Sequence, residues 1–322
     1  MKVGILGAGN IATKMAQTLT MMTTAKAAAV ASRDYGRAKA FADKYGVPKA
    51  YGSYEELFQD PEVNLVYIAT PHSHHYEQMM AALNHGKHIL CEKAFTANAV
   101  QAKEVLDLGE KKKLLVAEAI WTRYMPMRKV MDEVLAQGLI GKAHILTANL
   151  GYPVHAVERL ARPELAGGAL LDMGVYPINF ALMTFGGDIK RIDSTVVKYH
   201  TGVDAQSSIT FTYGDDRMAI LYCSMLSRSD RLGVVSGEKG YIEFRNINNC
   251  EGIHVYNTED ERIASYETPR QLTGFEYQIE SCSKAIEAGS IECPEMPHSE
   301  ILKVMGIMDQ LRKDWGLQYP CE

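Results

Sequence analysis

The first third of the chain alternates short β-rich runs with helical runs, and this order limits the possible fold more than any other feature. The expected strands are residues 3–6, 27–32, 65–70, 88–91 and 114–117. The expected helices are residues 11–21, 35–45, 75–85 and 96–110, with a short helix capped by Ser53 and Glu56. Such alternation predicts an α/β Rossmann-type domain, in which a parallel sheet carries helices on both faces.

The pattern changes near Glu118. After an expected helix at 126–137, seven runs alternate apolar and polar residues: 144–152, 192–200, 207–213, 217–225, 232–237, 241–245 and 253–257. These runs predict an α+β domain with a large, mainly antiparallel sheet that is open on one face. The helices expected with it are 169–185, 274–288 and 299–315. We therefore expect a dinucleotide-binding domain at 1–119 and a substrate-binding and dimerisation domain at 120–322.

Composition excludes several classes of partner. The net charge of −5 shows no bias toward polyanions, so we expect no nucleic-acid partner. No apolar run approaches the roughly 18 residues that a membrane helix needs, so we expect no membrane partner. The six cysteines form no C-x-x-C pair, which argues against a zinc ribbon or a disulfide framework and favours a cytoplasmic location.

A glycine-rich turn follows the first expected strand. Gly7, Gly9 and Ala12 have the spacing G-x-G-x-x-A, and Asn10 and Ile11 open the next helix. Gly7 allows a tight turn, and Gly9 lets the backbone approach a pyrophosphate, which then faces the free N–H groups of the helix start. The alternative is a tight glycine turn that binds no ligand.

The residues that end the second strand indicate which dinucleotide binds. NAD enzymes usually place an acid there to accept a hydrogen bond from the ribose 2′-hydroxyl, but this chain has Ser32 and Arg33. A hydroxyl and a guanidinium suit a 2′-phosphate, so we predict NADP as the cofactor. Asp34 follows directly and weakens the inference, and the alternative is that Arg33 merely faces solvent.

Polar side chains also end the two central strands. The segment TPHSHH, from Thr70 to His75, follows one strand, and CEKA, from Cys91 to Ala94, ends the next. In open parallel sheets, ligands bind at this edge. We expect no metal, because no cluster of cysteines or carboxylates accompanies the histidines. The residues expected to contact the cofactor here are Thr70, Pro71, His72, His75, Glu92 and Lys93.

Several motifs together resemble the Gfo/Idh/MocA oxidoreductase family. These are the glycine loop, ATPHSHH, GKHILCEK and GGALLDMGVYP. EAIWTRYMP, LAQGLIGK and the terminal QYP are similar to the dimeric dihydrodiol dehydrogenases, a subgroup that also acts as NADP-dependent D-xylose dehydrogenases. The resemblance covers nearly the whole chain.

The resemblance implies a catalytic pair, Lys93 and Tyr176, with Asp172 as the acid of the D-x-G-x-Y motif. Tyr176 would exchange a proton with the substrate oxygen, and Asp172 would orient Lys93 or a substrate hydroxyl. Asp172 and Tyr176 lie four residues apart, so in a helix they would share one face. Without the resemblance, a core tyrosine and an acid that complements the helix dipole would explain them equally well.

The resemblance also implies that Trp121 and Arg123 bind substrate in the active cleft. The alternative is that both are buried interdomain anchors. The family usually has a proline after the motif lysine, where this chain has Ala94, and we expect the peptide between Lys93 and Ala94 to be cis as it often is in the family.

These inferences predict an enzyme, an NADP-dependent oxidoreductase that transfers a hydride between nicotinamide and a sugar or vicinal diol. One alternative is a non-catalytic NADP-binding sensor of the same fold, and another is a glycoside-cleaving relative that recycles a bound NAD. The strands after residue 190 carry apolar residues in both phases in places, so we also expect a homodimer that covers the outer face of the second sheet.

Overall fold

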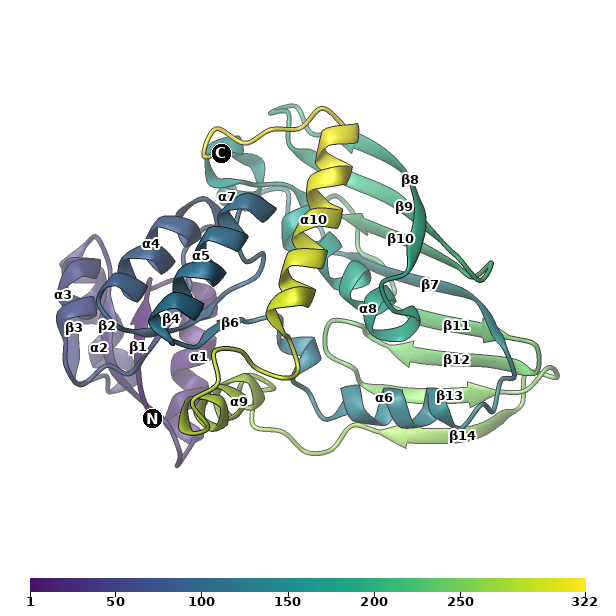
Figure 1. Ribbon diagram of the computed structural model, residues 1–322, viewed down its shortest axis with the longest axis horizontal. Coiled ribbons are helices and arrows are strands. Elements are labelled where there is room, and N and C mark those ends of the chain that lie inside the picture. The colour runs from purple at the N-terminus through teal and green to yellow at the C-terminus, as the bar shows by residue number, and fades with distance from the viewer. The chain divides into compact units, whose positions relative to one another are not determined.

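The computed structural model describes residues 1–322 and contains two compact units (Figure 1). The first unit consists of residues 1–124 and 271–305, and the second of residues 125–270 and 306–322. The chain therefore enters the second unit, returns to the first and ends in the second. Each unit has its own sheet.

The first unit is built on a six-stranded parallel sheet with the strand order β3-β2-β1-β4-β5-β6. Its strands are β1 (Lys2–Leu6), β2 (Lys26–Ala31), β3 (Lys49–Tyr51), β4 (Leu65–Ile68), β5 (His88–Cys91) and β6 (Val116–Glu118). Its helices within residues 1–124 are α1 (Asn10–Met21), α2 (Tyr35–Tyr45), α3 (Tyr54–Gln59), α4 (His72–Asn84) and α5 (Ala99–Lys112). The predicted Rossmann architecture is confirmed.

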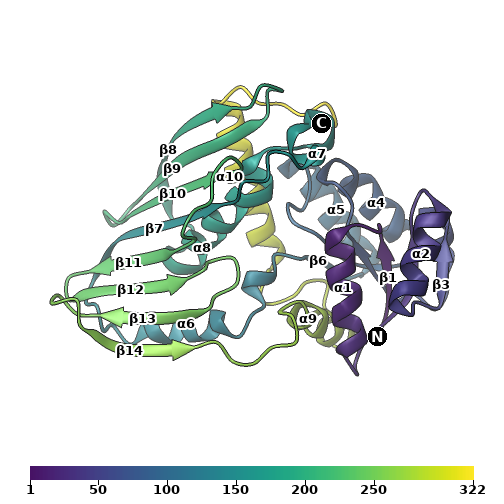
Figure 2. The same ribbon diagram turned by 180° about the vertical axis from the view of Figure 1, so that it is seen from behind.

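Both faces of this sheet are covered. Helices α4 and α5 lie on one face, and α1 and α2 lie on the other (Figures 1 and 2). Every residue of β4 is buried as a result, which explains why the strand reads as a continuous apolar run. The covered faces leave the ends of the strands as the accessible part of the sheet.

The returning segment completes the first unit. It contains α9 (Glu276–Glu287), which lies beside α1, where the hydroxyls of Thr18 and Thr273 are 2.7 Å apart. The Val116 N–H of the edge strand donates to the Ile291 carbonyl at 2.9 Å. The expected domains are continuous in sequence and do not include this return. The assignment of functions to residues 1–119 and 120–322 stays a prediction.

The second unit is built on an eight-stranded sheet with the order β14-β13-β12-β11-β7-β10-β9-β8. All neighbours are antiparallel except β7 and β10, which run parallel. The strands are β7 (Ala143–Gly151), β8 (Ile189–Lys198), β9 (Asp204–Tyr213), β10 (Met218–Ser224), β11 (Gly233–Gly237), β12 (Gly240–Arg245), β13 (Gly252–Tyr256) and β14 (Arg262–Glu267). The predicted mainly antiparallel sheet is confirmed.

Helices cover one face of this sheet (Figure 1). The central one, α8 (Val175–Phe185), packs on β7 and β10. The other helices outside the first unit's core are α6 (Met127–Ala136), the short α7 (Glu158–Ala161) and α10 (His298–Asp314), which passes from the first unit into the second.

One helical run is longer and more apolar than expected from the sequence. Residues 163–185 reach a mean hydropathy of 1.3 and could cross a membrane by length and composition alone. However, 89% of the most apolar window is buried inside the protein. Burial of this kind is typical of a core helix in a soluble protein.

The opposite face of the second sheet carries exposed apolar side chains. In β10, Met218, Ile220 and Tyr222 are 36%, 42% and 43% exposed, whereas the alternate residues Ala219 and Leu221 are fully buried. The neighbouring strand β7 extends this apolar surface, because its 42% exposed Ile145 pairs with Met218.

Candidate active site

The glycine turn between β1 and α1 has the geometry of a phosphate loop. Gly7 has a φ of +102°, and a Cβ there would lie 2.9 Å from the Ala69 carbonyl oxygen, so only glycine fits. Gly9 is the N-cap of α1 and offers no side chain to its N–H groups. A Cβ on Gly9 would meet no atom within 4 Å, so the backbone faces open space. Asn10 and Ile11 begin the helix there, and the loop fits a dinucleotide pyrophosphate.

The three polar residues that follow β2, Ser32, Arg33 and Asp34, differ in exposure and in hydrogen bonding. The Asp34 carboxylate caps α2 by accepting a hydrogen bond from the Arg37 N–H at 3.2 Å. Ser32 is buried and its hydroxyl accepts from the Asp34 N–H at 3.4 Å, whereas Arg33 is exposed. Asp34 therefore has a structural task, and Arg33 is the residue that can reach a 2′-phosphate.

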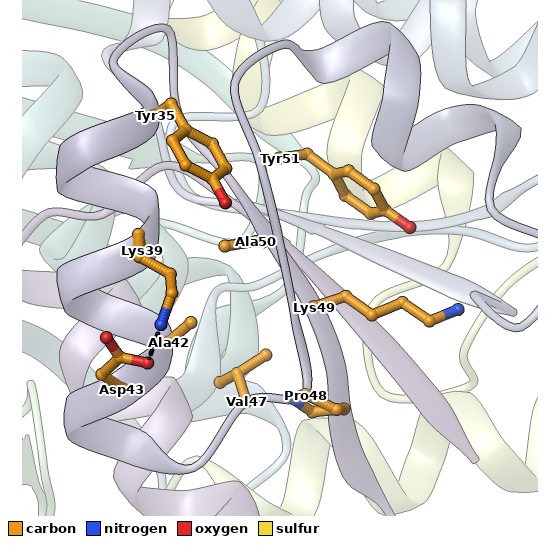
Figure 3. Close-up of a pocket in the computed structure, with 9 residues that line it drawn as sticks. All are labelled: Tyr35, Lys39, Ala42, Asp43, Val47, Pro48, Lys49, Ala50 and Tyr51. Atoms are coloured by element: carbon orange, nitrogen blue, oxygen red, sulfur yellow. Dashed lines mark hydrogen bonds and ion pairs between the residues drawn. The ribbon is translucent and has the colours of Figure 1, made fainter.

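A shallow pocket of about 340 Å³ lies on the outer side of the same unit, between α2 and β3 (Figure 3). Figure 3 shows Lys39 and Asp43 of α2 paired with each other at its wall. Tyr35 and Tyr51 also line the pocket. None of the predicted site residues lines it, so it is separate from the predicted site.

The histidine segment starts a helix rather than forming a loop. Helix α4 begins at His72, earlier than the expected start at His75, so the histidines occupy its first turn. His75 is fully buried, with Nδ1 3.0 Å from the Ala94 carbonyl oxygen and Nε2 2.9 Å from the Thr70 carbonyl oxygen. Burial lowers the pKa of His75 to about 4. A neutral ring can donate to only one of these two carbonyl oxygens. The side chain lies between the residue after Lys93 and the end of β4.

The residues around His75 are also largely enclosed. His72 is 5% exposed and its ring contacts the His75 ring edge-on, while the Thr70 hydroxyl donates to Gln78 at 2.6 Å. Pro71 is the N-cap of α4. Nowhere in residues 1–322 do three or more His, Cys, Asp or Glu side chains gather in a way that could hold a metal ion.

Glu92 and Lys93 follow the end of β5. Glu92 is 7% exposed and accepts a hydrogen bond from the Tyr67 hydroxyl of β4. Lys93 is half-buried. The peptide between Lys93 and Ala94 is cis, as expected.

Trp121 and Arg123 lie in a 3₁₀ turn after β6. The Trp121 ring stacks on Phe275 with centroids 4.5 Å apart, and Arg123 is 6% exposed and donates to Glu300 at 2.9 Å. Both partners belong to the returning segment of the same unit, so these contacts anchor that segment. The roles of Trp121 and Arg123 in substrate binding stay predictions.

In the second unit, Asp172 and Tyr176 lie on either side of a change in helix type. Residues Leu170–Gly174 form a π-helical turn, and α8 starts at Val175, whereas a regular α-helix was expected from residue 169. At the start of this turn, the Leu170 N–H donates to the buried Asp204 carboxylate at 2.5 Å. Turns of this kind are rare and occur frequently at functional sites. Tyr176 is 8% exposed.

Sequence reasoning missed two charged residues. Arg159 of α7 donates to the Asp172 carboxylate at 3.0 Å, and its side chain is 41% exposed. Glu118, the last residue of β6, is 1% exposed. For Arg159 the sequence offered no signal, whereas an acid directly after the apolar run 114–117 was a weak signal for Glu118.

The predicted site residues therefore fall into two sets, one in each unit. The carboxyl ends of parallel strands gather the first set: Gly7, Gly9, Ser32, Arg33, Thr70, Pro71, His72, Glu92 and Lys93. The π-turn and the start of α8 carry the second set, Asp172 and Tyr176, with Arg159 beside them.

Comparison with known proteins matches both parts of the chain to one family. Residues 1–119 match "Oxidoreductase family, NAD-binding Rossmann fold", and residues 129–243 match "GFO/IDH/MocA C-terminal domain". The human trans-1,2-dihydrobenzene-1,2-diol dehydrogenase is 34% identical over 98% of this chain and 97% of its own. The Xenopus tropicalis protein of the same name is 31% identical over 99% of both chains.

Solved structures share the fold. A 3-ketoreductase from Actinomadura kijaniata, solved with NADP and TDP-benzene, superposes with a TM-score of 0.89 at 24% identity over 97% of both chains. An aldose-aldose oxidoreductase from Caulobacter crescentus, complexed with glycerol, gives a TM-score of 0.88 at 19% identity over 98% of both chains.

Proposed function

Because this chain belongs to the Gfo/Idh/MocA family of oxidoreductases, we propose that it is an NADP-dependent dehydrogenase of vicinal diols or sugars. The observation that carries the proposal is the first set of site residues, in which a phosphate loop, an exposed Arg33 and Lys93 share one edge of a parallel sheet. The names of the curated relatives and their identity over almost the whole chain support a diol as substrate.

The proposed cofactor follows from residues of this chain. Gly7 and Gly9 would hold the pyrophosphate at the start of α1, and Arg33 would bind the 2′-phosphate with Ser32 beside it. A bound nicotinamide supplies or accepts the hydride at the substrate carbon. Asp34, which would otherwise select NAD, is occupied as the cap of α2.

The proposed proton transfer belongs to Tyr176. Oxidation of an alcohol removes a hydride from carbon and a proton from oxygen, and the phenolate of Tyr176 would accept that proton. The Lys93 ammonium would orient the substrate oxygen. Asp172, which accepts a hydrogen bond from Arg159 at 3.0 Å, would bind a neighbouring substrate hydroxyl.

The direct test is a substrate panel followed by NADPH absorbance. We expect NADP⁺ reduction with trans-1,2-dihydrobenzene-1,2-diol, with D-xylose, or with both, and weaker reduction of NAD⁺. A protein that binds NADP but turns over no diol or sugar would instead be a sensor. Nucleotide that stays bound through gel filtration would point to the glycoside-cleaving alternative.

We also propose a homodimer that buries the open face of the second sheet. The support is the row of exposed apolar side chains on that face, because exposed apolar patches commonly mark protein interfaces. Light scattering at micromolar concentration is expected to give twice the chain mass of 35.7 kDa. A mass of one chain would contradict the dimer.

The proposed location is the cytoplasm. All six cysteines are free thiols, including the buried pair Cys282 and Cys293, whose sulfurs are 3.8 Å apart. Cell fractionation is expected to recover the protein in the cytosol with every thiol reduced. Recovery in a secreted or membrane fraction would contradict this.

A further inference from the structure

A buried acid without hydrogen bonds ends strand β6. Glu118 is 1% exposed, and neither oxygen of its carboxyl group makes a hydrogen bond. The Phe95 peptide N–H lies near the carboxyl but does not meet it in hydrogen-bond geometry. Buried carboxyl groups are almost always hydrogen-bonded or paired, so this one calls for an explanation.

The strand register places this acid next to the loop that carries Lys93. Glu118 of β6 pairs with Cys91 of β5, and the Ala119 N–H donates to the Cys91 carbonyl at 2.7 Å. Lys93 follows Cys91 by two residues, and the loop continues to Phe95. The Glu118 side chain therefore lies at the base of the Lys93 loop.

Burial and the neighbouring charged groups Glu92, Lys93 and Arg123 act on the Glu118 carboxyl, together with the nearby Phe95 N–H. Burial is the largest and raises its pKa, and Glu92 adds to this, whereas Arg123 and Lys93 favour the ionised form. The result is a pKa of about 7. The nearby Cys91 thiol and Tyr124 hydroxyl have pKa values raised well above their usual range by burial, so both stay neutral.

Two other buried acids of the same unit have the hydrogen-bond partners that are typical of a structural carboxylate. Asp60 is 4% exposed and accepts hydrogen bonds from Lys49 at 3.0 Å and Tyr51 at 3.1 Å. Glu276 is 4% exposed and accepts from the N–H groups of Leu272 and Gly274, both at 2.7 Å. Both stabilise local structure through fixed donors, and Glu118 has none.

We propose that Glu118 is a positioning residue, whose buried carboxyl attracts the Lys93 ammonium and so restrains the loop that carries it. The inference rests on the proposed function, which gives Lys93 its catalytic role. When Glu118 is ionised, its negative charge attracts the Lys93 side chain and holds it in place. When it is protonated, this support is lost while the packing of the loop is retained.

The first test measures the reactivity of the Lys93 amine in the full-length protein. Acetic anhydride labels only neutral amines, and mass spectrometry reports labelling of Lys93 relative to exposed Lys103. Glu118→Gln keeps the size of the side chain and removes its charge. Labelling of Lys93 near neutral pH is expected to rise roughly tenfold in this variant, because the amine loses the attraction that restrains it. The matched control Asp60→Asn also removes a buried carboxylate and is expected to leave the ratio unchanged. An unchanged ratio in folded Glu118→Gln overturns the proposal.

The second test reads the carboxyl itself by infrared spectroscopy during a pH titration. A carboxylic C=O band is expected to disappear as pH rises through neutrality, and to be absent in Glu118→Gln. Coupling is reciprocal, so Lys93→Met is expected to move the midpoint of this band to higher pH. Asp204 of the other unit also has a raised pKa and could give a similar band. If Glu118→Gln does not fold, a shift of the band midpoint in Lys93→Met assigns the band to Glu118 rather than to Asp204. If Lys93→Met leaves the midpoint pH of the band unchanged, the proposal is overturned.

Neither readout needs substrate or turnover. A protein that oxidises no diol can still show the coupling of Glu118 to Lys93, and an active dehydrogenase can lack it. Failure of the proposed function and failure of this inference are therefore distinguishable.

Discussion

The two sheets of this protein meet their surroundings in different ways. In β4 of the first sheet, every residue from Leu65 to Ile68 is buried between helical layers. In β10 of the second sheet, buried Leu221 is flanked by Ile220 and Tyr222, which are 42% and 43% exposed. The first sheet thus offers only its strand ends to a ligand, whereas the second offers a whole face.

This difference explains where each unit carries its polar chemistry. In the first unit, Arg33 and Lys93 follow strand ends, because the faces are filled with apolar side chains. In the second unit, Asp172 and Tyr176 come from the helical layer, and the open sheet face carries no predicted catalytic residue. The proposed cofactor site therefore lies at the strand ends of the sheet that is covered on both faces, and the proposed dimer interface lies on the open face of the other sheet.

The largest expected effect tests whether the second unit acts through its helical layer. Tyr176→Phe removes one hydroxyl and is expected to lower kcat by about 10²–10⁴-fold, since that is the usual contribution of general acid–base catalysis. Stopped-flow or steady-state NADPH absorbance measures kcat. The affinity for NADP is expected to stay nearly unchanged. The control Tyr213→Phe removes the hydroxyl of a 3% exposed sheet tyrosine that makes no hydrogen bond. Similar turnover in both variants would mean that Tyr176 is a structural core residue and does not transfer the proton.

The second prediction compares the two sheets by stability. Ile68→Ala empties a fully buried position in β4 and is expected to cost about 2–5 kcal/mol of unfolding free energy. Ile220→Ala on the open face is expected to change the unfolding free energy by no more than about 0.5 kcal/mol, measured at protein concentrations low enough for the chain to be monomeric. Urea denaturation measures both. Equal costs at high dilution would mean that the second sheet is covered within a single chain.

The third prediction concerns the cofactor edge of the first sheet. Arg33→Ser is expected to weaken NADP binding by about 1.5–3 kcal/mol, because one charge-assisted contact to the 2′-phosphate is lost. NAD binding is expected to stay the same. Titration calorimetry measures both affinities, and the control is Arg37→Ser, which changes an exposed arginine in the first turn of α2. Equal affinity of the natural protein for NAD and NADP would remove the basis for this assignment.

The smallest expected effect contrasts one buried acid from each unit. In the second unit, burial raises the pKa of Asp204 from 3.8 to about 6. In the first unit, hydrogen bonds from Glu62 N–H, Lys49 and Tyr51 outweigh burial and lower the pKa of Asp60. A raised pKa means that the folded state holds the proton more tightly, so the Asp204 contribution is full below pH 3.8 and is lost as pH rises through about 6. The Asp60 contribution has the opposite sign: it is present above pH 3.8 and is lost on acidification.

The measurement is unfolding free energy against pH for each Asn variant and the natural protein. Between about pH 4 and pH 7, the natural protein is expected to lose about 1–3 kcal/mol relative to Asp204→Asn. Relative to Asp60→Asn it is expected to gain stability at lower pH, as the pH rises to about 3.8, and to change little above about pH 5. Parallel curves for both variants would contradict the assigned directions.

Much of the first unit was predictable because its signals are contiguous. Gly7 and Gly9 follow a strand directly, and Arg33 and Lys93 each follow the end of another. Parallel strands bring such ends to one edge whatever the details of packing, so residue order alone predicted this set. The second unit was predictable as a mainly antiparallel sheet, because alternation of apolar residues is also a local signal.

Other features depend on which distant segments meet, and local patterns do not report that. The return of residues 271–305 to the first unit and the parallel pairing of β7 with β10 join segments far apart in the chain. The π-turn before Tyr176 was missed for a related reason, because its start is held by Asp204 of a distant strand.

The sequence by itself determined the order of elements and the phosphate loop, because turn chemistry and periodicity are properties of neighbouring residues. It pointed to Lys93, Asp172 and Tyr176 only through the resemblance of their motifs to a known family. Only the tertiary structure decided that Arg159 holds Asp172 and that Glu118 is buried without hydrogen bonds. Burial and ion pairing follow from the exclusion of water by segments that are remote in sequence. The electrostatic environment of a catalytic side chain is therefore set by long-range packing, even when the side chain itself can be found in a motif.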